Sequence, residues 1–408
     1  MIFEFFLPRT GGTLKNIHLN LTDTGQKKTF AFRTSLRIPE TDWDREKQRP
    51  LNIYLKKYKR LNARLDEIKL QLTEYVKKRN EERKEPLQRV MTNRIKDVCS
   101  GNKAELPENS LLFLMKRYTD SRKELICFST YKRYKVFYQL TERFEGFIRK
   151  RLCIEDVNSD FVSNFVRFGK EEEYSENTVY RSIHFVKTIL NFAERKGIKT
   201  HIKELEIRRE KQKREIVTLS EKEIEQIKRT EVKKDLQDAK DWLLISCYTG
   251  QRFSDFMNFN TGQLKRISGK TCIFFTQKKT KKEILLPLHP MVSNIVLQNG
   301  NQFPRPMEMQ EYNRQIKEVA RISNVNEPVK ARKRIGYRSK NTETEKWETL
   351  SSHIGRRSFA TNFYGKIPTA LLMEATGHST EQMFRRYINP RNEDRIVSLG
   401  NFFERISL

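Results

Sequence analysis

The sequence predicts an α+β protein of several domains: a small antiparallel sheet followed by a long helix, then a helical bundle, then a mostly helical domain with a small β-sheet. Three observations predict this class. The first 50 residues hold three short runs in which apolar residues alternate with others, as in strands with one buried face. Much of the remaining chain repeats its apolar residues at steps of three and four, as helices do. The 408 residues are enough for two or three domains.

The first domain is predicted over residues 1–85. Its three strands are centred on residues 3–7, 17–21 and 30–38, with a hairpin turn at the Asp-Thr-Gly sequence before the third. A long helix follows over residues 51–75, with apolar residues at the a and d positions of four heptads. This helix either packs on the preceding sheet or forms a coiled-coil seam with a second copy of the chain. The tyrosines in its apolar stripe favour packing on the sheet, because tyrosine is an unusual seam residue.

Two charged segments are predicted as linkers on either side of a helical domain at residues 108–201. The first, residues 86–107, contains two prolines and a glycine, and the second, residues 202–217, lacks a sustained apolar stripe. Inside the helical domain, Ser110 and Asn177 are predicted to cap the N-termini of two helices. The pattern as a whole is typical of a compact four-helix domain.

The third domain is predicted over residues 218–408. It begins at a capping box formed by Ser220 and Glu223, which marks a helix N-terminus. Residues 271–288 read as a β-hairpin with lysines at its tip, and residues 324–349 read as a second, basic hairpin. Apolar residues in the C-terminal tail predict one more helix there, which docks on a neighbouring protomer or on its own domain.

The charge of the chain points to a polyanionic partner. Lysine and arginine number 81 and aspartate and glutamate 52, for a net charge of +29. Nucleic acid is favoured over a membrane surface, because the basic residues recur in every segment instead of gathering on one amphipathic helix. No run of about 18 apolar residues predicts a membrane span, and the N-terminus does not resemble a signal peptide. Five basic residues of the helical domain interleave with aromatic and aliphatic ones and predict either a DNA-binding face or a solvated charged face: Lys132, Arg133, Lys135, Arg181 and Lys187.

The cysteine and histidine patterns argue against several site types. The five cysteines are never spaced CxxC, and the six histidines form neither HxxxH nor HExxH. A disulfide scaffold and a dedicated metal site are therefore not expected, and the chain suits a reducing cytosol.

The third domain carries an ordered set of residues suited to holding a phosphate. Arg252 follows a helix-breaking glycine and begins the next helix, beside free backbone N–H groups. His353 and Arg356 are three residues apart and so share one helix face. His378 and Tyr387 follow, nine residues apart. Taken singly, each has an ordinary structural explanation: a solvated arginine, a solvated turn for the hairpin lysines, or a half-buried tyrosine.

The order of the set resembles that of the tyrosine recombinase (phage integrase) family. The matching pieces are TGQRFSD, QKKTKK, SSHIGRRSFATNFY, ATGHST and MFRRYI, which together span residues 245–390. The resemblance implies that the third domain is catalytic and that the helical domain is a SAM-like domain that binds the core DNA site. The domain order, with looser similarity, also resembles the integrases of conjugative transposons and related mobile elements, which implies that residues 1–85 bind arm-type DNA.

The resemblance also implies a role for each matched residue. Tyr387 would attack a DNA phosphodiester and form a 3′-phosphotyrosine link, so neither ATP nor a metal or other cofactor would be needed. Arg252 and Arg356 would bind the phosphate, with His353 and His378 hydrogen-bonding to it. A further set would assist: Lys279 as the proton donor to the leaving oxygen, with Lys278 as the alternative, and Asp255 as a brace for Arg252 or nearby backbone.

The implied partners are double-stranded DNA at core and arm-type sites, three further copies of the chain in a homotetramer on DNA, and DNA-bending accessory proteins. The implied location is the cytoplasm, at the nucleoid. Three other functions fit the same residues less well. They are a site-specific invertase or resolvase, a DNA-binding regulator with a silent active site, and a relaxing topoisomerase.

Overall fold

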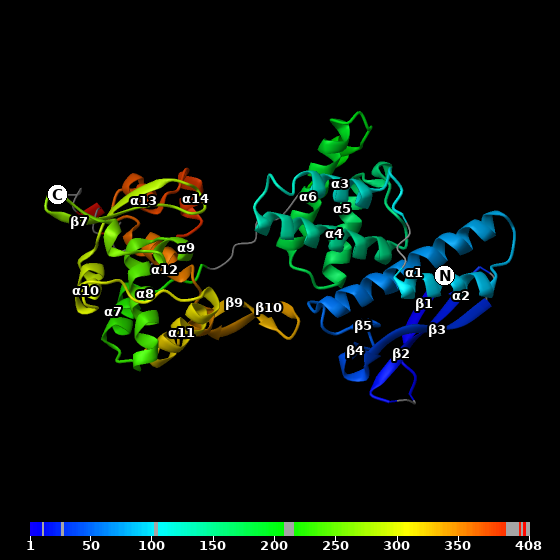
Figure 1. The fold of residues 1–408 in the computed structure, drawn as a ribbon, viewed down its shortest axis with the longest axis horizontal. Helices are drawn as coiled ribbons and strands as arrows, with labels where there is room; N and C mark the ends of the chain where they lie inside the picture. The colour runs from blue at the N-terminus through cyan, green and yellow to red at the C-terminus, as the bar shows by residue number, and fades with distance from the viewer. Residues whose placement is uncertain are drawn as a thin grey trace. The chain divides into compact units, whose positions relative to one another are not determined.

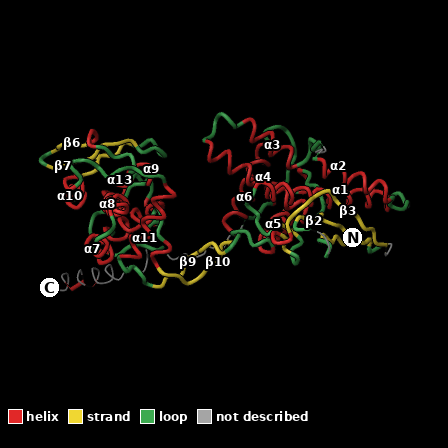
Figure 2. The backbone as a smooth tube through the Cα atoms, turned by 60° about the horizontal axis from the view of Figure 1, so that its bottom comes forward, coloured by secondary structure: helices red, strands yellow, loops and turns green. Residues whose placement is uncertain are grey.

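The computed structural model describes residues 1–9, 12–25, 28–101, 105–207 and 216–388, together with Gly400, Phe403 and Glu404. The chain divides into two compact units (Figure 1), one made mainly of residues 1–211 and the other of residues 212–333 and 340–408. Each unit is described by itself. In Figure 2 the strands fall at the N-terminal sheet, at β6 and β7, and at β9 and β10, with helices making up most of the rest.

The N-terminal sheet is antiparallel with the order β1-β2-β3, as the alternating runs predict. Its strands are β1 (Ile2–Phe6), β2 (Leu14–Asp23) and β3 (Lys28–Pro39). Every second residue is buried, with Phe5, Leu19 and Leu21 almost fully so. A short antiparallel pair follows, formed by β4 (Trp43–Asp44) and β5 (Arg49–Pro50).

The long helix α1 (Lys56–Glu81) packs its apolar stripe into the same core as the sheet. Leu65, Ile68 and Leu72 are buried there beside sheet residues, which confirms the helix-on-sheet arrangement. The stripe is thus occupied within the chain and does not form a seam. The helix begins later than predicted, because Leu51 and Tyr54 precede it and are exposed.

The predicted linker at residues 86–107 is wrong over much of its length, because it contains the helix α2 (Gln88–Ser100). Met91, Ile95 and Val98 follow helical spacing and are buried in the N-terminal core. The surrounding charges hid this short apolar face. The N-terminal domain therefore extends to about residue 100 and not to residue 85.

The helical domain has the four helices expected, with a core of its own. They are α3 (Leu111–Ser121), α4 (Phe128–Ile148), α5 (Ser159–Glu171) and α6 (Glu176–Glu194). Ser110 caps α3 as predicted, by accepting a hydrogen bond from the backbone N–H of Phe113. The cap of α6 is Ser175 and not Asn177, because the helix begins one residue before Asn177.

The predicted linker at residues 202–217 is partly structured. Residues Ile202–Glu204 form a short 3-10 helix, and Ile202 and Leu205 are buried in the core of the helical domain. The first part of this segment thus belongs to that domain. Residues 208–215 lie outside the described part of the chain.

The second unit is mostly helical and centres on α8 (Lys234–Thr249), which contacts α7, α10, α11 and α12. Ser220 and Glu223 form the predicted capping box at the start of α7. The other helices are α7 (Glu221–Arg229), α9 (Phe253–Phe256), α10 (Pro290–Gln298), α11 (Met309–Ile322), α12 (Ile354–Phe363), α13 (Thr369–Thr376) and α14 (Glu381–Arg385).

Both predicted hairpins are present. The first is formed by β7 (Lys270–Thr276) and β8 (Glu283–Pro287), to which β6 (Leu264–Ile267) adds a third strand that the sequence did not predict. The second is formed by β9 (Pro328–Ile335) and β10 (Arg338–Glu345). The predicted tail helix lies almost entirely outside the described residues.

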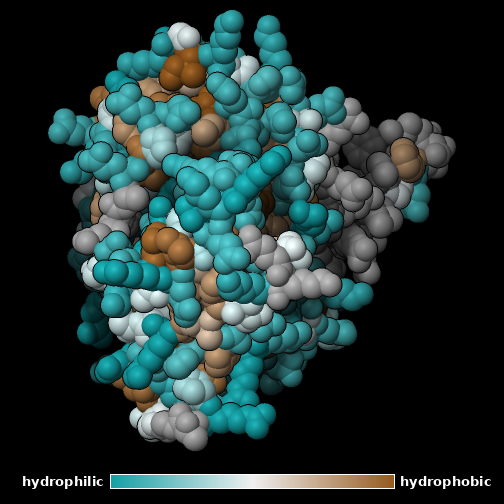
Figure 3. Space-filling view, turned by 90° about the vertical axis from the view of Figure 1, so that its right-hand side faces the viewer, coloured by the Kyte–Doolittle hydropathy of each residue, from teal (hydrophilic) through white to brown (hydrophobic). Residues whose placement is uncertain are grey.

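No helix in the described ranges is both long and apolar enough to cross a membrane. The face drawn in Figure 3 is mainly hydrophilic, with small separate apolar areas. That surface is consistent with a chain in which one residue in three is charged.

Candidate active site

Five of the six predicted catalytic residues form one cluster in the second unit, in which four of them gather around the fifth, Arg356. Helix α8 ends at Gly250 (φ +65°), which turns the chain so that Arg252 stands at the start of α9. Helix α12 begins directly after His353 and carries Arg356 in its first turn. Helix α13 ends at Gly377 (φ +71°), which places His378 beside these residues. Both glycines adopt a left-handed conformation that other residues adopt at a cost.

Arg356 is the centre of the cluster and is fully buried. Its guanidinium donates hydrogen bonds to the backbone oxygens of Gly250 and Thr376, both at 2.8 Å. The same group lies 3.0 Å from Nε2 of His378, and 5.3 Å separate its carbon from the centre of the Tyr387 ring. Burial, followed by the charge of Arg252, lowers the pKa of Arg356 to about 10, so the group is still charged at neutral pH.

His378 is held as a neutral imidazole. Its Nδ1 lies 2.8 Å from the hydroxyl of Thr376, and that hydroxyl donates its own proton to the backbone oxygen of Leu372. The hydroxyl therefore accepts from Nδ1, which leaves Nε2 as the acceptor facing Arg356. Burial, then Arg356, Arg252 and Lys282, lower the pKa of His378 to about 3.

Tyr387 stands next to this histidine. Its half-buried ring lies 5.0 Å from the His378 ring between centroids, and its backbone N–H donates to the oxygen of Phe384. Helix α14 ends at Arg385, so Tyr387 lies in the turn that follows this helix. The tyrosine thus meets Arg356 and His378 of its own chain.

Arg252 is positioned from two sides. One guanidinium nitrogen donates to the side-chain oxygen of Gln277 at 2.8 Å, and the same nitrogen lies 4.0 Å from Asp255. Asp255 is buried and also accepts a hydrogen bond from the backbone N–H of Lys278 at 2.9 Å. Asp255 therefore contacts both candidates for its supporting role, the arginine and the neighbouring backbone.

Lys278 and Lys279 lie on the exposed turn between β7 and β8. Neither ammonium group makes a hydrogen bond or ion pair with another described residue, and neither touches the cluster. Lys279 is near enough to be one of the charges that lower the pKa of His353. The choice of Lys279 over Lys278 as proton donor stays a prediction.

His353 stands at the edge of the cluster with part of its ring exposed to solvent. The partly buried side of the ring loses hydration, and Arg357, Arg356, Arg252 and Lys279 add positive charge, in that order. Both causes lower its pKa. His353 is therefore neutral at pH 7 and able to accept a proton.

Sequence reasoning missed three residues that hold this site together. Gln251 donates to the backbone oxygens of Thr249 and Ala375, and Gln277 links Arg252 to the end of α13. Thr376 supplies one acceptor to Arg356 and another to His378. The available signals were weak: each residue lies within a matched motif, but nothing in a single sequence shows which motif residues are buried.

The basic residues predicted to bind DNA belong to the first unit. Lys132, Arg133 and Lys135 lie exposed on α4, and Arg181 and Lys187 lie on α6, with Lys187 half-buried. Two of these lysines stack on aromatic rings of the same helix: Lys132 lies 4.4 Å from the centre of the Phe128 ring and Lys135 4.5 Å from that of Tyr131. The interleaving read from the sequence is thus present in three dimensions.

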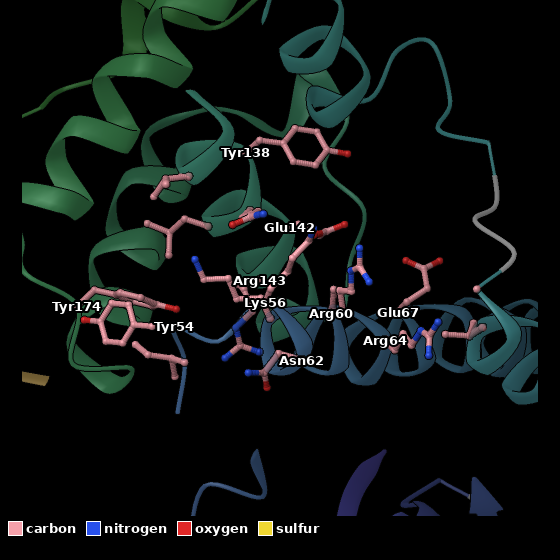
Figure 4. Close-up of a pocket in the computed structure, with 18 of the residues that line it drawn as sticks. Tyr54, Lys56, Arg60, Asn62, Arg64, Glu67, Tyr138, Glu142, Arg143 and Tyr174 are labelled. Atoms are coloured by element: carbon pink, nitrogen blue, oxygen red, sulfur yellow. The ribbon is translucent and has the colours of Figure 1, made fainter. Parts of the chain in front are cut away.

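A cavity of about 560 Å³ also lies in the first unit, between α1 and α4 (Figure 4). Tyr54 and Tyr174 stand at one end, and Arg60 and Arg64 project from α1. None of the six predicted catalytic residues lines it. In the described part of the chain, no three His, Cys, Asp or Glu side chains gather as a metal site would require.

Comparisons with known proteins match two parts of this chain. The model of the phage integrase family matches residues 218–394, and that of the phage integrase SAM-like domain matches residues 110–207. Together they cover about two thirds of the chain. A comparison with the curated proteins found no match.

Solved structures share the fold. The integrase of the Tn1549 transposon, in complex with a circular intermediate DNA, is 16% identical with a TM-score of 0.53, covering 72% of this chain and 99% of that one. The XerH site-specific recombinase, bound to a palindromic difH substrate, is 13% identical with a TM-score of 0.51, covering 74% and 98%. The family models and the ordered cluster lead to one conclusion: this chain belongs to the phage integrase family of tyrosine recombinases.

Proposed function

We propose that the protein cleaves and rejoins DNA at specific sites through a 3′-phosphotyrosine intermediate, and that it thereby integrates and excises a mobile genetic element. The observation that carries the chemistry is the packing of Tyr387 against the Arg356–His378 pair of its own chain. A nucleophile beside a buried, preorganised cation is the arrangement that phosphoryl transfer requires. The mobile-element role rests on the domain order.

Each of the predicted catalytic residues has its own role in the cleavage step. The Tyr387 oxygen attacks the phosphorus, its proton passes to neutral His353, and the bond from phosphorus to the 5′-oxygen breaks as Lys279 gives that oxygen a proton. Arg252 and Arg356 stabilise the charge that grows on the non-bridging oxygens. Phosphotyrosine keeps the energy of the broken bond, so the reverse attack by a 5′-hydroxyl rejoins DNA.

The nucleophile is tested with a nicked suicide DNA. Cleavage of this DNA releases a short fragment that carries the new 5′-hydroxyl, and its escape prevents rejoining. We expect the wild type to form a covalent adduct that survives denaturation. Tyr387→Phe should form no detectable adduct, which corresponds to a decrease in the rate of adduct formation of at least about 10⁴-fold. The variant should still bind DNA and fold, because it keeps the ring that packs on His378. An adduct of equal yield in both proteins would assign cleavage to another residue.

The low pKa of His353 predicts how cleavage depends on pH. Its pKa lies below the ordinary 6.5, so the imidazole is mostly neutral at pH 7 and above, and the rate of adduct formation should change little between about pH 8 and about pH 7. The rate should fall only at lower pH, as His353 becomes protonated. His353→Gln should be slower throughout and should lack that acid limb. An acid limb centred above pH 7 in the wild type would contradict this assignment.

The remaining proposals concern partners. The bundle of α3–α6 would bind the core site with the basic residues of α4 and α6, and the N-terminal domain, residues 1–100 as the fold bounds it, would bind arm-type DNA. The net charge of +29 supports both. A homotetramer on DNA, DNA-bending accessory proteins and a cytoplasmic, nucleoid-associated location complete the proposal, and they rest on the family resemblance.

A further inference from the structure

Gln277 occupies the point where three catalytic segments meet. It follows directly after β7, and its side chain is fully buried. Its amide nitrogen donates to the side-chain oxygen of Gln251 (3.2 Å) and to the backbone oxygen of Thr376 (3.1 Å). Its amide oxygen accepts from Arg252 (2.8 Å) and from the hydroxyl of Thr280 (2.6 Å). A carboxamide offers two donors and two acceptor positions, and this one uses all four.

The backbone of Gln277 also closes the lysine-bearing turn. Its N–H donates to the oxygen of Lys282 at 2.8 Å, and its oxygen accepts from the N–H of Lys281 at 2.9 Å. Asp255 holds the same turn through the N–H of Lys278. The base of the turn is therefore fixed from inside the protein, while Lys279 is exposed to solvent.

The end of α13 packs directly on the same carboxamide. A side chain at Gly377 would begin only 2.6 Å from the Gln277 oxygen, so the backbone that leads into His378 lies against it. Gln251, the partner of Gln277, donates in turn to the oxygen of Ala375 in α13. A shift of the carboxamide would thus displace Arg252, the turn and the end of α13 at the same time.

We propose that Gln277 is a positioning residue for strand cleavage. Its carboxamide couples the position of the turn that carries Lys279 to the position of the Arg252 guanidinium. The inference rests on the proposed function and adds a mechanism to it. When Arg252 engages the phosphate, the Gln277 oxygen and Thr280 hold the turn in register, so that Lys279 Nζ can protonate the 5′-oxygen as its bond to phosphorus breaks. Leaving-group protonation is in this way tied to correct phosphate binding.

Only an uncharged amide meets these requirements. It accepts from a cation while donating to two oxygens, which neither methionine nor glutamate can do at this position. Gln277→Met removes all four bonds at nearly unchanged volume. Thr280→Val removes only the bond to the turn, at an exposed residue whose loss should leave the fold intact.

The test compares two DNA substrates in single-turnover adduct formation. One is ordinary nicked DNA, and in the other sulfur replaces the bridging 5′-oxygen at the cleavage site. A thiolate leaves without a proton, because a thiol has a pKa near 8.5 whereas an alcohol's is far higher. A defect in leaving-group protonation should therefore vanish with sulfur, and a defect in phosphate stabilisation should remain. Lys279→Ala is the reference for a defect in leaving-group protonation, and Arg356→Lys is the reference for a defect in phosphate stabilisation.

We expect Thr280→Val to slow cleavage of ordinary DNA about 10-fold, and Gln277→Met about 10²-fold, in line with the cost of small misplacements in active sites. On sulfur DNA, Thr280→Val should regain the wild-type rate, and Gln277→Met should regain at least a factor of 10. Its residual defect would report the loosened Arg252. Thermal unfolding midpoints and DNA affinity identify any folding defect. Thr280→Val should keep the wild-type midpoint, whereas Gln277→Met should unfold at a lower temperature because it leaves buried polar partners unpaired.

The outcomes separate the two levels of the argument. If the wild type forms no adduct on either substrate, the proposed function itself fails. Two results would contradict the coupling and leave the proposed function standing. In the first, the wild type reacts and both variants cleave ordinary DNA at the wild-type rate. In the second, the cleavage rate of the variants falls by the same factor on both substrates. Should Gln277→Met fail to fold, the result with Thr280→Val decides.

Discussion

Replacing Arg356 by lysine is expected to slow strand cleavage at least about 10³-fold while DNA binding stays within a few-fold of wild type. The guanidinium is buried and reaches the Gly250 and Thr376 oxygens and His378 at once, with a geometry that one ammonium cannot copy. Lysine keeps the positive charge, so the decrease in cleavage rate would measure the contribution of the fixed hydrogen-bonding geometry of the guanidinium. Truncation to alanine is less informative, since it also strands two buried carbonyls and costs stability.

Arg385→Lys provides the matched control for this exchange. Arg385 is an exposed residue of α14, two positions before Tyr387, and its ion pair is with Glu381. The same chemical change there should leave the rate within about twofold, because exposed ion pairs contribute little. Both variants are compared by single-turnover adduct formation at saturating protein. Equal rates for Arg356→Lys and the wild type would mean that Arg356 does not contact the reacting phosphate.

Gly355→Ala is expected to destabilise the catalytic domain by at least about 3 kcal/mol or to prevent its folding. An added Cβ would lie 1.9 Å from the Ser246 hydroxyl oxygen and 2.7 Å from the Ser246 backbone carbon. Helices α8 and α12 therefore touch along their backbones here, directly beside Arg356. The higher helix propensity of alanine, about 1 kcal/mol, works in the other direction and is overridden.

Gly262→Ala is the corresponding control in the same domain. A Cβ there would meet only the tip of the exposed Asn260 side chain, at 3.1 Å, which can move aside. We expect its free energy of unfolding to change by less than about 1 kcal/mol. Chemical denaturation of both variants checks the pair. A Gly355→Ala protein as stable as the wild type would show that the two helices are not packed as closely as described.

The sequence could predict what depends on local pattern. Alternating runs marked the N-terminal sheet, Ser110 and Ser220 marked two helix starts, and the lysine-tipped hairpin was visible between its strands. The matched motifs also identified residues that the fold brings together from helices α9, α12 and α13 and the turn after α14. Local chemistry and a recognisable order sufficed for these.

Other features depend on tertiary contacts that no local pattern reveals. The charges around helix α2 predict a linker, because only four of its residues form an apolar face. The helix is stable because the N-terminal core buries that face. The network of Gln251 and Gln277 joins residues that are 124 and 99 positions apart in the sequence. The contact of Gly355 with Ser246 likewise joins two helices far apart in sequence.

The most direct test of the account is to identify the residue and the DNA end in the covalent adduct. The adduct is trapped on suicide DNA and digested with protease, and the DNA-bearing peptide is sequenced by mass spectrometry. The account predicts a peptide that carries the 3′-phosphate on Tyr387, together with a free 5′-hydroxyl on the other strand end. Attachment at another residue, or through a 5′-phosphate, would contradict it.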